Sequence, residues 1–170
     1  MTDVKPGRLV RAAEVAVNAA THAHPWNSNS EMTGVQLGRL ASLERTGINL
    51  FRLSPGRESF VYHAHDCEEE WLYVLSGVGT LEMDGVEHPI GPGDFVGFPA
   101  PSVAHQMRNT GGGDDLVYLV GGEHRDVEVA RFPKHGKRMV RVGNRIDIYS
   151  DEDAEPFGPA RYAQVKRTGG

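Results

Sequence analysis

The sequence predicts an all-β fold, either an antiparallel sandwich or a jelly-roll barrel. Short segments rich in aromatic and β-branched residues recur at even spacing between residues 48 and 120, and turns with Gly or Pro separate them. Few segments in this region have a helical period. A length of 170 residues and a hydrophobic fraction of 39% suit one domain with one core. We expect a barrel at 47–121, an N-terminal extension at 1–46 that packs on it, and a C-terminal extension at 122–170.

The N-terminal extension has two parts. Residues 8–18 fit either a helix or an edge strand, because the alanines favour helix and the valines favour strand. Residues 21–33 are rich in Asn and Ser and contain Pro25, so we expect a loop. This segment includes His22-Ala23-His24, which has no acidic residue at a ligand spacing.

The first barrel strands surround a histidine pair. A strand is expected at 48–53, and Ser54-Pro55-Gly56 turns the chain into a second strand at 60–62 that leads to the histidines. Glu70 is expected to open the next strand at 71–75.

A hairpin follows at Asp84-Gly85, a pair of residues that favours a two-residue type I′ loop between two short alternating segments. In that register Met83 pairs with Val86. The inner face then carries Leu81, Met83, Val86, His88 and Ile90.

The remaining strands are expected after a second turn at 91–93. Three strands, at 94–98, 104–109 and 116–120, complete the barrel, and the second of them carries His105 and Met107 on one face.

In the C-terminal extension, two added edge strands are expected at 139–142 and 146–149. A surface tail is expected at 151–170, frayed from residue 161.

Three side chains near the first turn have the spacing of a metal site. His63 and His65 are two apart on a predicted strand, so both imidazoles point to one face about 6.6 Å apart, at about 3.3 Å per residue. Glu70 can reach the same point if the chain turns at Asp66-Cys67 and pairs back. Glu69 is the nearest rival, but it should point to the opposite face because adjacent strand residues alternate.

A second block brings in a third histidine, and the two blocks together resemble the two motifs of the cupin superfamily. The first motif is matched by His63-Ala64-His65, four residues, Glu70, six residues and Gly77. The second is matched by Gly93, five residues, Pro99, then His105, three residues and Asn109. Two departures are a Gly56 one residue early and an extra residue, with no Gly, between Pro99 and His105. The resemblance covers residues 48–120.

The resemblance implies a double-stranded β-helix, or jelly-roll barrel, that holds one divalent metal ion through His63, His65, Glu70 and His105. Three imidazoles and one carboxylate suit Fe, Mn, Ni, Co or Zn, and an octahedral ion would keep about two positions for substrate and for water or oxygen. Cupins of this kind include dioxygenases, isomerases, decarboxylases and oxidases. We therefore expect a metal-dependent enzyme on a small oxygen-rich substrate, with a dioxygenase-like oxidoreductase ranked first.

Two other functions stay open at this stage: a sugar or sugar-phosphate isomerase, and a non-catalytic small-molecule binder or sensor. An apolar pocket would favour aromatic substrates, and a pair of Lys or Arg residues would favour phosphates. The candidate substrate-binding residues are Met83, Met107, His88 and Tyr118. No catalytic base is assigned; the candidates are Glu58, Glu68, Glu69, Tyr62, Tyr73, Tyr118 and His88.

The charge and the apolar content of the chain argue against two classes of partner, nucleic acids and membranes. A net charge of -5 argues against a nucleic-acid surface, and no apolar run is long enough for a membrane-spanning helix. One cysteine, Cys67, permits no intrachain disulfide, and the N-terminus has no signal-like apolar segment, so a cytoplasmic protein is expected. A homodimer is also expected, because extensions flank a barrel whose sheet edges invite pairing.

Overall fold

The computed structural model describes residues 5–155, so most of the expected tail, including the part from 161 to 170 expected to fray, lies outside the described residues. Strands dominate, and the helices are short. The strands are β1 (Ala20–His24), β2 (Asn27–Val35), β3 (Thr46–Leu53), β4 (Ala64–His65), β5 (Glu70–Ser76), β6 (Gly79–Met83), β7 (Val86–Ile90), β8 (Phe95–Phe98), β9 (His105–Arg108), β10 (Leu116–Glu123), β11 (Val127–Phe132), β12 (Lys137–Val142) and β13 (Arg145–Ser150). The helices are α1 (Ala12–Val17) and α2 (Leu37–Leu40), with 3₁₀ turns at Pro133–His135 and Asp151–Asp153.

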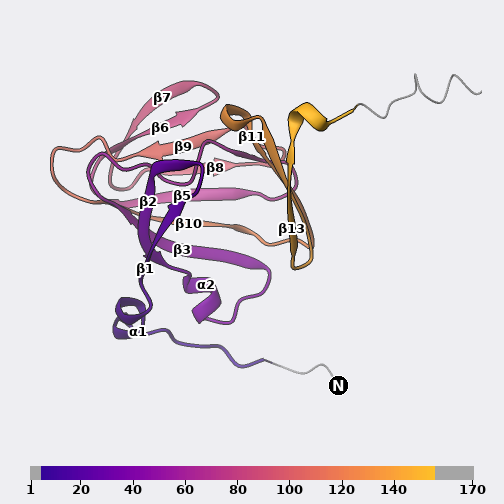
Figure 1. Ribbon diagram of the computed structural model, residues 1–170. Helices are drawn as coiled ribbons and strands as arrows, with labels where there is room; N and C mark the ends of the chain where they lie inside the picture. Colours follow the sequence, from indigo (N-terminus) through magenta and orange to yellow (C-terminus); the bar gives the residue numbers. More distant parts are fainter. Residues whose placement is uncertain (1–4, 156–170) are drawn as a thin grey trace, which may run out of the picture.

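The strands form a jelly-roll barrel of antiparallel sheets, as the sequence predicts. One sheet has the order β1-β2-β3-β10-β5-β8, a second has β7-β6-β9, and a third has β13-β12-β11-β4. Figure 1 shows the small β7-β6-β9 sheet above the large sheet, and the β11–β13 region standing along one side of the barrel. No helix among residues 5–155 is long and apolar enough to cross a membrane.

The core lies between the large and the small sheet. Alternate residues of the strands point inward, and their apolar side chains form one buried cluster. Members from the large sheet include Leu53, Leu72 and Tyr118, and those from the small sheet include Leu81 and Met107. This packing holds the strand ends that carry the histidines in fixed positions.

The hairpin at Asp84-Gly85 is confirmed. Both residues have positive φ, 49° and 77°, as a type I′ turn requires, and Met83 pairs with Val86 across it. The predicted barrel strands after it are present, with no end more than three residues from the expected position, and the edge strands of the C-terminal extension are present as β12 and β13.

Two expectations about the first 62 residues are wrong. In the segment 8–18, left open between helix and strand, residues 12–17 form the helix α1. Residues 21–33 are not a loop but most of the β1–β2 hairpin, because β2 finds a partner strand in β3 and the buried Ser30 hydroxyl donates to Ser59 O at 2.5 Å. Residues 60–62 form no strand. Backbone pairing around them is limited to isolated bridges at Glu58 and at His63, which exchanges two backbone hydrogen bonds with His105.

The C-terminal sheet belongs to the barrel wall. β11 pairs with the short β4, so that Ala130 lies opposite His65 and Arg131 lies opposite Ala64. Val61, Ala130 and Phe132 form a second buried cluster under this sheet, with Trp26 and Met139 packed against it. The extension therefore reaches the strand that carries the histidine pair.

Candidate metal centre

Three strand ends bring the candidate ligands together. His63 and His65 flank Ala64 at β4, Glu70 is the first residue of β5, and His105 is the first residue of β9. The chain from 66 to 69 makes the turn between the two motif halves. All four side chains are buried or half-buried.

Glu70 lies at the centre of the histidines. Its Oε2 is 2.7 Å from His105 Nε2, 3.8 Å from His65 Nε2 and 4.0 Å from His63 Nε2. The ligand atoms of His63, Glu70 and His105 all lie within 4.8 Å of one another, so these residues could hold a metal ion.

The far side of each imidazole ring is occupied. His63 Nδ1 lies 2.8 Å from Val61 O, and His105 Nδ1 lies 3.2 Å from Val103 O. A carbonyl oxygen only accepts, so both Nδ1 atoms carry the hydrogen and leave Nε2 to face Glu70. At 2.7 Å, His105 Nε2 and Glu70 Oε2 need a proton or a cation between them. This electron-rich donor set fits a divalent metal ion.

The protonation states suit the same role. Burial lowers the pKa of His63 to about 3, although the charge of Glu70 opposes this effect. Burial alone would raise the pKa of Glu70, but the contact with His105 and the charges of the neighbouring imidazoles lower it to about 2. A neutral imidazole and an ionised carboxylate are the forms that bind metal.

The four side chains open into one cavity of about 430 Å³. No Lys or Arg of residues 5–155 lines it. Its apolar wall comes from the large sheet, the 59–60 segment, β9 and the C-terminal sheet: Met32, Phe51, Phe60, Leu72, Met107, Val120, Ala130, Phe132 and Met139. The remaining wall residues are His22, Gln36, Asn49, Ser59 and Tyr118.

Tyr118 brings a polar atom into this apolar wall. Within the described part of the chain, the partner of its hydroxyl is Met32 Sδ at 3.9 Å, a weak acceptor. Burial and then the charge of Glu70 raise the pKa of Tyr118 well above its usual range. The phenol therefore stays protonated at neutral pH and can donate a hydrogen bond to a molecule in the cavity.

Of the four candidate substrate-binding residues, Met107 and Tyr118 line the cavity, whereas Met83 and His88 do not. Met83 packs on the core cluster, and His88 on β7 pairs with Leu81 on β6. Of the candidate bases, only Tyr118 is in the cavity wall.

Several wall residues were not predicted from the sequence. Asn49 and Phe51 are two apart on the predicted strand 48–53, and that spacing could have shown that they share a face. Phe132 and Met139 come from the C-terminal extension, and no sequence pattern placed that extension beside the histidines.

Comparisons with known proteins identify the family. Residues 49–122 match the cupin domain family. The solved structure of a proposed sugar phosphate isomerase from Acidithiobacillus ferrooxidans is 37% identical, covers 88% of this chain and 96% of that chain, and has a TM-score of 0.82.

Two curated proteins are more distant. Quercetin 2,3-dioxygenase from Bacillus subtilis is 33% identical over 81 residues, which are 45% of this chain and 24% of that protein. An oxalate-binding protein from Thermotoga maritima is 28% identical over 113 residues, 66% of this chain and 91% of that protein. The chain thus spans about a quarter of the dioxygenase and most of the oxalate-binding protein.

Proposed function

Because the chain belongs to the cupin family, we propose that it is a metal-dependent oxidoreductase with dioxygenase-like chemistry on a small oxygen-rich substrate. His63, His65, Glu70 and His105 would hold one divalent ion from among Fe, Mn, Ni, Co and Zn. Such an ion, when bound, supplies Lewis acidity and, if it is redox-active, access to oxygen chemistry.

The observation that supports this proposal most is an apolar cavity around the ligand set. A substrate with an aromatic or alkyl body would pack against side chains such as Phe51, Phe60 and Phe132. Its chelating oxygens would point toward the strand ends that carry the histidines. The same wall offers no positive side chain from residues 5–155 for a phosphate.

Within the cavity, the residues of the chain have separate tasks. The carbonyls of residues 61 and 103 keep His63 and His105 with Nε2 free for the ion. The aromatic wall excludes water from the reacting atoms. Tyr118 donates a hydrogen bond to a substrate oxygen and stabilises charge that develops there.

The test is elemental analysis of protein purified without added metal, followed by oxygen uptake with the metal-loaded protein. Substrates are vicinal diols and keto acids with aromatic or alkyl bodies. We expect one ion per chain and oxygen uptake with members of this panel. Tight binding of those compounds without turnover would instead identify a binder, the role that the name of the oxalate-binding relative suggests.

A sugar-phosphate isomerase is the second candidate, supported by the name of the 37% identical relative from Acidithiobacillus ferrooxidans. It predicts turnover of sugar phosphates without oxygen uptake. The lack of a Lys or Arg in the described cavity wall disfavours it, because phosphate sites in proteins use such side chains. Turnover of a sugar phosphate by the anaerobic protein would overturn our first choice.

Replacing Tyr118 by Phe is expected to slow turnover by about fivefold, the effect of losing one hydrogen bond of about 1 kcal/mol. The melting temperature should not change, because the hydroxyl has only a weak thioether contact at 3.9 Å to lose. The matched control is Tyr73→Phe on the outer surface of β5, which should leave both quantities unchanged. Equal kcat/KM in Tyr118→Phe and the wild type would contradict the role.

We also propose that the protein is a homodimer. β13 is the edge of its sheet, and Ile146 and Ile148 on it are 58% and 48% exposed. An edge strand with exposed apolar side chains can pair with a second copy of the chain. Light scattering at micromolar concentration should give twice the chain mass, and Ile148→Lys should lower it. A monomer mass for the wild type would refute the proposal.

A further inference from the structure

A second group of acidic side chains lies next to the candidate ligands. The ligand atoms of His65, Glu68 and Glu128 also come within 4.8 Å of one another. Both carboxylates are already engaged. Glu68 pairs with Arg141 and accepts the Arg125 N–H at 2.5 Å, and both oxygens of Glu128 accept backbone N–H groups. Because these oxygens already have partners, we interpret the group as structural support for the metal centre and not as a second metal site.

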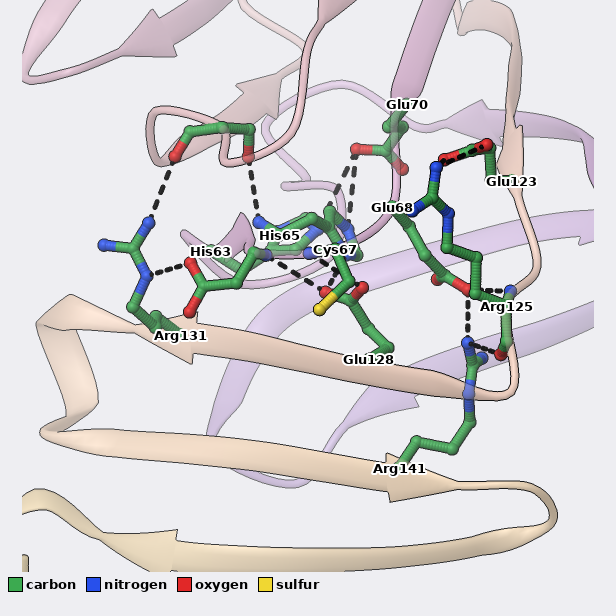
Figure 2. Close-up of polar contacts among 12 residues, drawn as sticks. His63, His65, Cys67, Glu68, Glu70, Glu123, Arg125, Glu128, Arg131 and Arg141 are labelled. Atoms are coloured by element: carbon green, nitrogen blue, oxygen red, sulfur yellow. Dashed lines mark hydrogen bonds and ion pairs between the residues drawn. The ribbon is translucent and has the colours of Figure 1, made fainter.

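From this arrangement we infer that Glu128 is a positioning residue of the metal centre, which holds the His65 ring so that Nε2 faces the ion. The inference rests on the proposed metal site. Glu128 Oε1 lies 3.2 Å from His65 Nδ1, on the side of the ring away from Glu70 (Figure 2). An acceptor at Nδ1 keeps the hydrogen there, and the lone pair is then on Nε2.

Glu128 makes its contacts to one short segment of the chain. Oε1 also accepts the Asp66 N–H, and Oε2 accepts the Cys67 N–H, both at 3.2 Å. The side chain is completely buried, and burial of a carboxylate is costly unless N–H donors surround it. Here three donors do so, His65 Nδ1–H and the backbone N–H groups of the next two residues, so all of them lie within residues 65–67.

The position of the His65 backbone does not depend on Glu128. Ser102 Oγ accepts the His65 N–H at 2.8 Å, and Ser102 N–H donates to His65 O at 2.7 Å. Arg131 pairs with Asp66 at 2.7 Å on the opposite side of the turn from Arg141 (Figure 2). Removing the Glu128 carboxylate should therefore change the orientation and tautomer of the ring more than the path of the chain.

Glu128→Gln is the informative substitution because it keeps the shape. If the amide oxygen faces Cys67, the NH₂ group faces His65 Nδ1 and forces the hydrogen onto Nε2, where it blocks the metal. If the amide oxygen faces His65 instead, the NH₂ group lies against the Cys67 N–H, so two donors face each other and that hydrogen bond is lost. Glu123→Gln is the matched control, since Glu123 accepts the Glu69 N–H at 3.3 Å in the same turn.

The experiment titrates metal-free protein with Co²⁺ and follows its visible absorption. Glu128→Gln should raise the dissociation constant by about 10- to 100-fold, the usual effect of losing the partner of a ligating histidine. Glu123→Gln should stay within about twofold of the wild type, because a surface contact of this kind adds little. Melting temperatures of the metal-free variants show whether each protein is folded.

A second measurement needs no variant. ¹⁵N NMR of the metal-free wild type should show His65 with its hydrogen on Nδ1. Wild-type Co²⁺ affinity in Glu128→Gln, or a His65 Nε2–H tautomer in the wild type, would overturn the role of Glu128 and leave the metal site standing. A wild type that binds no Co²⁺ would overturn the metal site together with this inference.

Discussion

Replacing Glu70 by Gln is expected to empty the metal site, whereas replacing the adjacent Glu69 should leave it filled. Glu70 Oε2 lies within 4.0 Å of the Nε2 atoms of His63, His65 and His105. An amide at this point removes the negative charge and can present N–H groups to the ion. Loss of a residue that only orients a ligand lowers metal affinity by about 10- to 100-fold, and loss of a ligand itself should lower it further.

Glu69 is a close control because it is the same residue type one position away. Its side chain is exposed, and its backbone N–H donates to Glu123 at 3.3 Å. The measurement is metal content per chain after identical purification of both variants and the wild type. Retention of the ion by Glu70→Gln together with its loss from Glu69→Gln would mean that the ligand assignment is shifted by one residue.

The barrel could be predicted because its signals are local. The Asp84-Gly85 turn determines the register of its own hairpin, and strand alternation places Met107 on the same face as His105. The histidine spacing likewise depends on residues a few positions apart. Such features need only the chain near them.

The rest of the site depends on distant contacts. The polar strand β2 is stabilised by pairing with β3 and by the Ser30–Ser59 hydrogen bond, so its own composition indicated a loop. Glu128 and Phe132 reach the centre because β11 pairs with β4, more than 60 positions earlier in the chain. Pairing of this kind leaves no periodic signal in the sequence.

The metal-free protein is expected to lose stability as the pH falls from about 6.5 toward 3. The folded-state pKa of His63 is about 3, and its usual value is 6.5. Between these values the unfolded chain binds a proton that the folded chain does not, so acid favours unfolding. Glu70 acts in the same direction at lower pH, since its pKa is about 2 in the fold against a usual 4.5.

The magnitude follows from the same difference. From pH 6.5 to 5, His63 alone lowers the free energy of unfolding by about 2 kcal/mol, at about 1.4 kcal/mol per pH unit. For a chain of this size that corresponds to a fall in melting temperature of about 4–8 °C. The measurement is thermal unfolding in the presence of a chelator at pH 7 and pH 5.

The variant His63→Asn should flatten this dependence, because Asn does not titrate. Its absolute stability is not the readout; the difference between pH 7 and pH 5 is. His88→Asn removes a histidine on β7 that lies outside the cavity, and it should keep the wild-type difference. If His63→Asn lost as much stability in acid as the wild type, the buried imidazole would not be the group that senses pH. That result would also remove the evidence that His63 is neutral in the fold, the form in which an imidazole binds metal.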